Sequence, residues 1–217
     1  AMDVLDAGAQ FTLANLTATG NLTNTIGVDI GTMIGNHTWA KSGINTYDVY
    51  GYVTVATTGT LNIEPGVTVR FTYGHDITVG GVLTATGTIS EPIIFTGWMP
   101  IPGMWAGLNF WGTPEQHAGG RFAYATIEYG GYGNRALVSI ENADVTFDHC
   151  TFQNSASDAI RIYPGAVNLS QAAPAPATQI HWSKLIDLGG YAVYNQTDQP
   201  VQASYNWWGV ANGPTTA

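Results

Sequence analysis

The chain has little positive charge and a single cysteine. Only six of its 217 residues are lysine or arginine, against 15 aspartates and glutamates, and the formal net charge is −9. Binding to nucleic acid or to an anionic membrane surface depends on basic patches that this composition cannot supply, so we expect no nucleic-acid partner. The lone Cys150 excludes an intrachain disulfide, and its position in a run of alternating residues predicts a buried packing role.

Long apolar runs and helical periodicity are also missing. No stretch approaches the ~20 apolar residues of a membrane span, so we expect no membrane insertion. No window of ten or more residues repeats apolar positions at intervals of three and four without glycine or proline, which argues against helices in the body of the chain. The five histidines are widely separated and lack ligand spacing, so no metal is expected from them.

What the sequence does contain is strand-like alternation separated by turn residues. Leu61-Asn62-Ile63 and Val67-Thr68-Val69-Arg70-Phe71 alternate apolar with polar side chains, and Pro65-Gly66 stands between them. The pattern recurs with an offset of 16 residues that aligns Leu61, Ile77 and Ile93. We therefore predict an all-β solenoid, a parallel β-helix, with coils of sixteen residues.

One continuous domain accounts for most of the chain. We predict a β-helix over residues 47–217, and a cap or first irregular coil over residues 1–46, because the open end of a solenoid must be covered. Two loop excursions interrupt the repeat, one over 97–120 with a short strand near Leu108, the other over 171–178.

Five glycosylation sequons favour an extracellular or cell-surface location. They begin at Asn15, Asn21, Asn36, Asn168 and Asn195. The opening Ala1-Met2-Asp3 resembles a vector remnant joined to a mature or excised segment, and we expect the chain to be part of a larger surface protein.

Several stretches resemble right-handed parallel β-helix repeat proteins of the pectate-lyase-like superfamily, of the microbial surface or secreted type. They are Leu61 to Phe71, Ile77 to Thr88, Pro92 to Thr96, Trp105 to Leu108, Tyr124 to Gly131, Cys150 to Ser155, and Asn206-Trp207-Trp208-Gly209. The resemblance covers about three quarters of the chain, from Tyr47 onward, and it implies the right-handed, single-stranded coil. It does not imply an activity, because this superfamily includes lyases, glycosidases, tailspikes and adhesins.

If the chain is an enzyme, its catalytic residues are expected among Glu128, Asp148, Asp158 and Arg161. Lyases of this fold use clustered carboxylates, calcium and a basic residue, so calcium is the one cofactor considered. A glycosidase needs two carboxyl groups roughly 5 to 9.5 Å apart, and Glu128 with Asp148 is the candidate pair on neighbouring coils. Asp148 and His149 are adjacent on an expected strand and should point to opposite faces. In the alternative, non-catalytic interpretation, Asp158 is an acid that bonds backbone groups at a turn, and the other candidates are solvated residues on strands.

Aromatic residues are the stronger indication of a binding surface. Trp98, Trp111, Tyr129 and Tyr132, with Arg135 for hydrogen bonding, are the candidates for stacking on the apolar faces of sugars. Trp105 is expected to be structural. Asn154, Asn195 and Asn206 could form an asparagine ladder inside a turn.

The leading hypothesis is a non-catalytic β-helix module that acts as a rigid spacer or adhesive surface, with a polysaccharide or cell-surface glycan as partner. The second hypothesis is a polysaccharide lyase or glycoside hydrolase of the same superfamily. An ice-binding surface is a third interpretation; it needs a flat ladder of threonines, which Thr60, Thr68 and Thr84 suggest over only a few coils.

Overall fold

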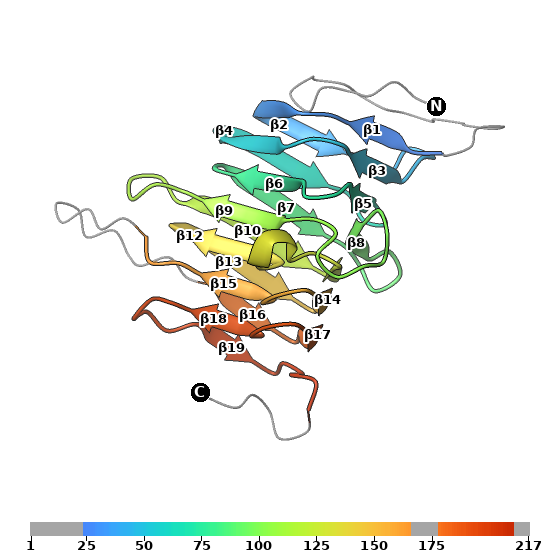
Figure 1. Cartoon of the computed structure of the whole chain (residues 1–217). Coiled ribbons are helices and arrows are strands. Elements are labelled where there is room, and N and C mark those ends of the chain that lie inside the picture. The colour runs from blue at the N-terminus through green and yellow to red at the C-terminus, as the bar shows by residue number, and fades with distance from the viewer. Residues whose placement is uncertain (1–23, 166–177, 211–217) are drawn as a thin grey trace.

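The computed structural model describes residues 24–165 and 178–210, and its strands form two parallel sheets (Figure 1). The seven-stranded sheet has the order β1 (Ile26–Val28), β3 (Thr46–Val49), β5 (Thr68–Phe71), β8 (Ile93–Gly97), β11 (Ala125–Glu128), β14 (Thr151–Ser155) and β17 (Lys184–Leu188). The second sheet has twelve strands, and the long β4 (Val53–Ile63) pairs along its length with β2 (Gly31–Trp39).

On its other side β4 pairs with two strands, so the second sheet has two arms. The first arm continues from the first half of β4 through β6 (Asp76–Val79), β9 (Gly107–Trp111), β12 (Val138–Glu141), β15 (Ile160–Ile162) and β18 (Val193–Asn195). The second arm continues through β7 (Val82–Thr86), β10 (Ala118–Ala123), β13 (Ala143–Asp148), β16 (Gln179–His181) and β19 (Gln202–Ser204).

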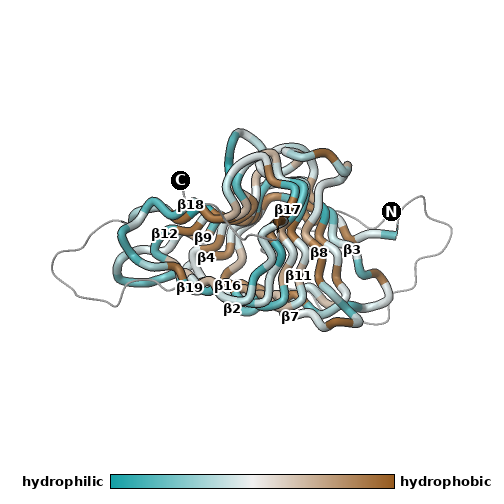
Figure 2. The backbone as a smooth tube through the Cα atoms, turned by 90° about the horizontal axis from the view of Figure 1, so that it is seen from below, coloured by the Kyte–Doolittle hydropathy of each residue, from teal (hydrophilic) through white to brown (hydrophobic). Residues whose placement is uncertain are grey.

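Each coil runs from the seven-stranded sheet through the first arm and the second arm, then back to the seven-stranded sheet. Viewed along the axis, successive coils superimpose (Figure 2). All strand pairs are parallel, and the only helix among the described residues is a single 3₁₀ turn, η1 (Tyr132–Asn134). The predicted all-β parallel β-helix is confirmed.

The predicted coil length of sixteen residues is wrong. Leu61 pairs with Leu83, not with Ile77, and Ile77 pairs with Val53 and Leu108. The 16-residue offset instead relates every second strand of the chain: Leu61 lies on β4, Ile77 on β6 and Ile93 on β8, each on a different side of the coil. All sides face the same core and have the same alternation, so sequence self-similarity could not separate a side from a coil.

Side chains from all three sides fill one continuous core. Phe71 stacks on Trp105 with ring centroids 4.1 Å apart, and the Trp105 indole N–H donates to the Glu128 carbonyl at 2.8 Å. Both rings are fully buried, which confirms the structural role predicted for Trp105. Cys150 is also buried, as predicted, and burial raises its pKa to about 12.

The N-terminal coil stacks in register on the next one. β1 pairs with β3, and β2 pairs with β4 with a register shift between Met33 and Gly35. The first excursion contains β9 between the connections 98–106 and 112–117, which agrees with the short strand expected near Leu108. Of the second excursion only Thr178 lies within the described residues. No helix in the described part of the chain is long and apolar enough to cross a membrane.

Candidate functional site

A groove lies on the outer face of the first arm. It encloses about 270 Å³ and is lined by Asn109, Trp111, Arg135, Ser139, Glu141 and Tyr163. Strand alternation explains this set: on β9, Leu108 and Phe110 point into the core while Asn109 and Trp111 point outward. The register places Asn109 beside Ser139 and Trp111 beside Glu141, so two rows of outward side chains cross neighbouring coils.

The floor of the groove is polar and yet shielded from solvent. Asn109 is 1% exposed and Ser139 is 2% exposed. Neither Asn109 Nδ2 nor Oδ1 has a hydrogen-bond partner of ordinary geometry among the described residues. A buried amide whose hydrogen-bonding groups lack well-formed partners is unfavourable by about 1–3 kcal/mol. This amide is therefore the strongest indication that the groove receives a hydrogen-bonding ligand.

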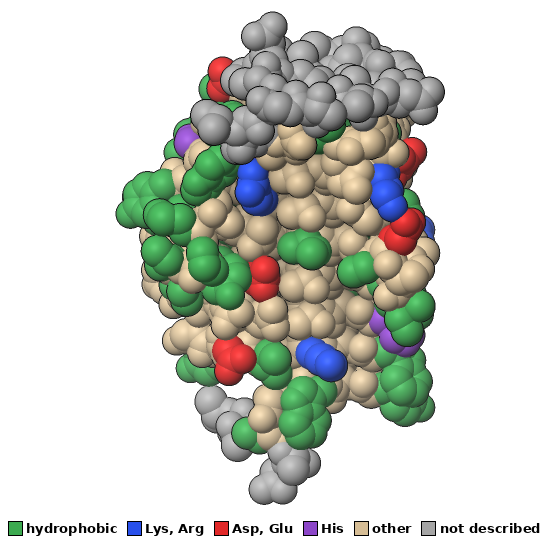
Figure 3. All heavy atoms as spheres, turned by 90° about the vertical axis from the view of Figure 1, so that its right-hand side faces the viewer, with side chains coloured by type: hydrophobic (Ala, Val, Ile, Leu, Met, Phe, Trp, Pro, Cys, Tyr) green, Lys and Arg blue, Asp and Glu red, His purple; other side chains and the backbone are tan. Residues whose placement is uncertain are grey.

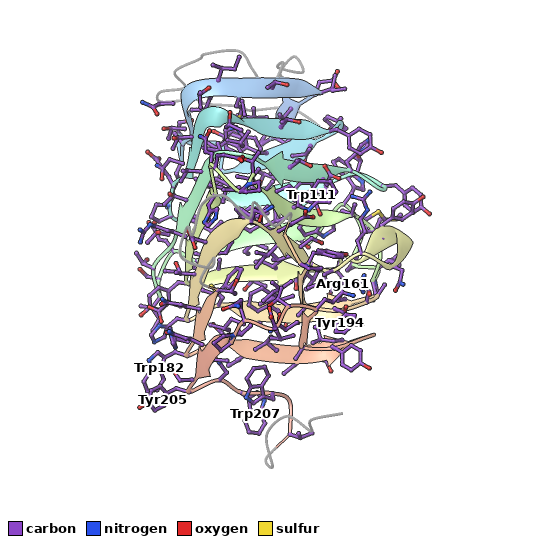
Figure 4. The ribbon with its side chains drawn as sticks, turned by 90° about the vertical axis from the view of Figure 1, so that its left-hand side faces the viewer. Trp111, Arg161, Trp182, Tyr194, Tyr205 and Trp207 are labelled. Carbon is purple, nitrogen blue, oxygen red and sulfur yellow. The ribbon has the colours of Figure 1, made fainter. Side chains whose placement is uncertain are left out.

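The rim of the groove is aromatic and charged. Trp111 is 48% exposed and forms one side, with Tyr163 two coils further along. Figure 4 shows Trp111, Arg161 and Tyr194 following one another down this side of the molecule. Glu141 supplies the carboxylate of the rim. An exposed ring beside polar groups is the combination that sugar-binding sites use.

An ion pair closes the end of the groove nearest the seven-stranded sheet. Arg135 Nη1 lies 3.3 Å from Asp76 Oδ2. Burial raises the pKa of Asp76 above its usual value, and the charge of Arg135 opposes this shift only in part. A weak hydrogen-bonding contact from the Asn109 side chain lowers the pKa of the Asp76 carboxyl slightly.

A second ion pair lies on the next coil. Arg161 donates from Nε to Asp158 Oδ2 at 2.7 Å, and Asp158 Oδ1 accepts the Tyr191 backbone N–H at 2.7 Å. The Arg161 guanidinium also lies 5.7 Å from the centre of the Tyr194 ring. Asp158 is thus engaged on both oxygens, by an arginine side chain and by the backbone of a distant residue.

The four predicted catalytic residues do not share one groove. Asp158 and Arg161 lie together on the first arm, but Glu128 lies on the outer face of the seven-stranded sheet, hydrogen-bonded to Thr96 and Gln153. Asp148 ends β13 on the second arm. The expected pairing of Glu128 with Asp148 is wrong, because Glu128 is paired with Gln153 and Asp148 with Ala123 and His181.

The prediction that Asp148 and His149 point to opposite faces is also wrong. The His149 ring nitrogen Nδ1 lies 2.9 Å from Asp148 Oδ1. His149 has left-handed backbone geometry with φ of 53°, so the strand ends at Asp148 and alternation no longer applies.

The predicted sugar-binding residues lie on two surfaces. Trp111 and Arg135 line the groove. Trp98 lies at the end of β8 with the Arg70 guanidinium 4.6 Å from its ring, and Tyr132 packs edge-on against Tyr73 at 4.8 Å. Tyr129 is partly buried and follows β11 with φ of 61°.

Sequence reasoning missed Asn109, Ser139, Glu141 and Tyr163. Their alternation within each strand is visible in the sequence, but their alignment across coils depends on offsets of 30 residues between β9 and β12 and 22 residues between β12 and β15. The connections between these strands differ in length, so a search for one constant repeat length does not find these offsets.

A column of stacked rings at the opposite corner was missed as well. Tyr124, His149, Trp182 and Tyr205 have left-handed φ between 46° and 59° and occupy the same turn in successive coils. Neighbouring rings are parallel to within 19°, with centroids 4.4 to 6.1 Å apart. Figure 4 shows Trp182 and Tyr205 together, away from the groove. Because the neighbouring rings cover one another's faces, the column stabilises the turn.

The asparagine ladder is absent from the described residues. Asn206 alone lies inside the turn, where it accepts from the Ser183 N–H and donates to the Ile180 carbonyl, while Asn195 bonds within its own loop. Asn154 lies near the end of β14 in the seven-stranded sheet. Within the described ranges no group of three histidines, cysteines or acids is placed to hold a metal ion.

Comparison with known proteins identifies one family. Residues 31–137 match the model of the pectate-lyase-like beta helix domain, a range that contains Asn109, Trp111 and Arg135 of the groove. Neither the curated proteins nor the solved structures give a significant match.

Proposed function

Residues 31–137 form a pectate-lyase-like beta-helix domain, and on this basis we propose that the chain is an extracellular module that binds a glycan in the first-arm groove without cleaving it. Domains of this family are typically extracellular. The rigid stack of coils also suits a spacer that presents such a groove away from its point of attachment.

The Asn109 amide, which is buried and has no hydrogen bond of ordinary geometry to any described residue, is the observation that carries this proposal. Sugar hydroxyls both donate and accept hydrogen bonds, so a bound sugar satisfies the amide N–H and carbonyl together. Trp111 offers a half-exposed ring at the rim, and Arg135 and Ser139 add further donors. A small number of polar groups beside an apolar surface is typical of a ligand-binding site.

The positions of the carboxylates favour binding over hydrolysis. Asp76 is level with Gly107, whereas Glu141 is level with Trp111 and lies two strands away from β6. Four residues along a strand and two strand spacings separate their backbones by about 16 Å. A glycosidase places its carboxyl groups roughly 5 to 9.5 Å apart. Asp158 is already held by Arg161 and Tyr191.

Affinity electrophoresis tests the proposal. The protein is run in native gels cast with hydroxyethyl cellulose, xylan or polygalacturonate, and the gels are then stained for clearing. We expect retardation without clearing in at least one gel, and its loss in Trp111→Ala and Asn109→Leu. Trp207→Ala is the matched control, because Trp207 is as exposed as Trp111 but lies outside the groove lining.

Retention of binding in Trp111→Ala together with its loss in Trp207→Ala would contradict the assignment of the groove. Clearing would support the lyase or hydrolase alternative instead. No retardation in any gel would favour a spacer without glycan contact.

A further inference from the structure

Exposed aromatic rings form a strip along one corner of the β-helix. The strip consists of Tyr50, Tyr52, Tyr73, Trp98 and Tyr132, which follow β3, β5, β8 and β11 on four consecutive coils. Each ring is between 38% and 65% exposed. Figure 3 shows hydrophobic side chains gathered along one edge of this face. An exposed apolar patch of this kind marks a contact surface.

The rings of the strip are held in place by contacts with one another and with charged neighbours. Tyr50 lies 6.2 Å from Trp98, and Tyr73 lies 4.8 Å from Tyr132. Arg70 covers Trp98 and is itself held by the buried Asp48 through Nε at 2.7 Å and Nη2 at 2.9 Å. A partner that binds here meets rings that have already lost much of their rotamer freedom.

The strip is continuous with the groove through one short connection. Tyr132 and Arg135 belong to the connection 129–137, in which Tyr132 contacts Tyr73 of the strip and Arg135 lines the groove. The middle of this connection is held by two hydrogen bonds: the Tyr132 N–H donates to the Trp105 carbonyl at 3.0 Å, and Arg161 Nη1 donates to the Asn134 carbonyl at 3.1 Å.

We propose that the strip extends the groove into one track for a linear polysaccharide, so that the groove binds one part of the sugar chain and Tyr132 and Tyr73 bind the part that follows. This inference rests on the proposed glycan binding. Gly107 lies where the first arm meets the strip, and Trp111 lies four residues further along β9. The strand extends over about 13 Å between them. A ligand that reaches from Trp111 to the strip must therefore be longer than a single sugar unit.

The composition of the strip favours a glycan over a protein partner. Tyrosine and tryptophan present flat apolar faces with a polar atom at the edge, which suits the alternating apolar and hydroxyl surfaces of a sugar chain. The rings of the strip pair across alternate coils, Tyr50 with Trp98 and Tyr73 with Tyr132, so that the strip extends over four coils along the helix axis. A linear polymer matches that elongated shape.

The dependence of affinity on oligosaccharide length tests the track. The probes are oligosaccharides of two and six units from cellulose, xylan and polygalacturonate, and affinity is measured by titration calorimetry. We expect the six-unit probe to bind at least tenfold more tightly than the two-unit probe. Tyr73→Ala and Tyr132→Ala should each weaken six-unit binding about three- to tenfold and leave two-unit binding unchanged.

Trp111→Ala separates the two proposals, because it should weaken binding of both probes. Tyr205→Ala is the control for loss of an exposed ring, and thermal melts establish that each variant is folded. Equal affinity for both lengths, or six-unit binding unaffected in the Tyr73 and Tyr132 variants, would overturn the track and leave the groove intact. If neither probe binds and Trp111→Ala matches the wild type, both proposals fail. Self-association that Tyr73→Ala abolishes would also overturn the track.

Discussion

The role of a buried residue in this protein depends on its chemical type and on where its side chain points. Asn109 and Cys150 are almost equally buried, but Asn109 points out of the coil into the groove and Cys150 packs within the core. A buried amide needs a partner, whereas a buried thiol behaves as a small apolar side chain. The same degree of burial therefore indicates a ligand in one case and packing in the other.

Cys150 predicts how stability changes at alkaline pH. Burial raises its pKa from 9.0 to about 12, so the folded state keeps the thiol protonated at pH values where the unfolded chain releases the proton. The stability from the neutral thiol is complete below pH 9 and is lost as the pH rises towards 12. Urea midpoints between pH 8 and 11 should fall more steeply for the wild type than for Cys150→Ala.

Tyr47, whose pKa burial also raises to about 12, is present in both proteins and cancels in that comparison. Parallel curves for the wild type and Cys150→Ala would contradict the prediction.

At the level of the strand, the bend between the first and the second arm determines the direction in which outward side chains point. β4 passes through both arms as one strand, but in the next coil the chain breaks at Gly80-Gly81 between β6 and β7. A Cβ on Gly81 would lie 2.2 Å from the Gly59 carbonyl oxygen and 2.3 Å from that of Ala56. Both are backbone atoms of β4 and cannot rotate away, so this close approach requires glycine.

Gly81→Ala should therefore destabilise the protein by about 3 kcal/mol, because the coils must separate to admit the methyl group. Gly119→Ala is the matched control: it lies in the same arm, and its nearest contact would be the Val82 side chain at an ordinary 3.4 Å. The difference in urea midpoint between the two variants is the measurement. Equal midpoints would show that the coils give way at Gly81 without cost.

Over the whole molecule, acidic residues are distributed on all sides of the coil. Glu128 lies on the seven-stranded sheet, Asp148 on the second arm and Asp158 on the first arm. In the groove region Asp76 and Asp158 are paired with Arg135 and Arg161. A calcium site must collect several carboxylates on one side and free them from such pairs.

We accordingly expect that no calcium is required. The melting temperature in 2 mM CaCl₂ should equal that in EDTA within 1 °C, since an ion that binds only the folded state would raise it by mass action. A rise that saturates with calcium concentration would contradict this expectation, and Asp76→Asn and Glu141→Gln would then locate the site.

Local sequence determined the strands, their turns and the inward role of residues such as Trp105 and Cys150, because alternation and turn chemistry act over a few neighbouring residues. It did not determine the coil length, since strands on different sides of one coil carry the same pattern. The groove depends on that length: Asn109, Ser139 and Arg161 become neighbours only when connections of unequal size bring their strands into register. Tertiary structure alone therefore decided which outward side chains meet, and with them where this protein can bind.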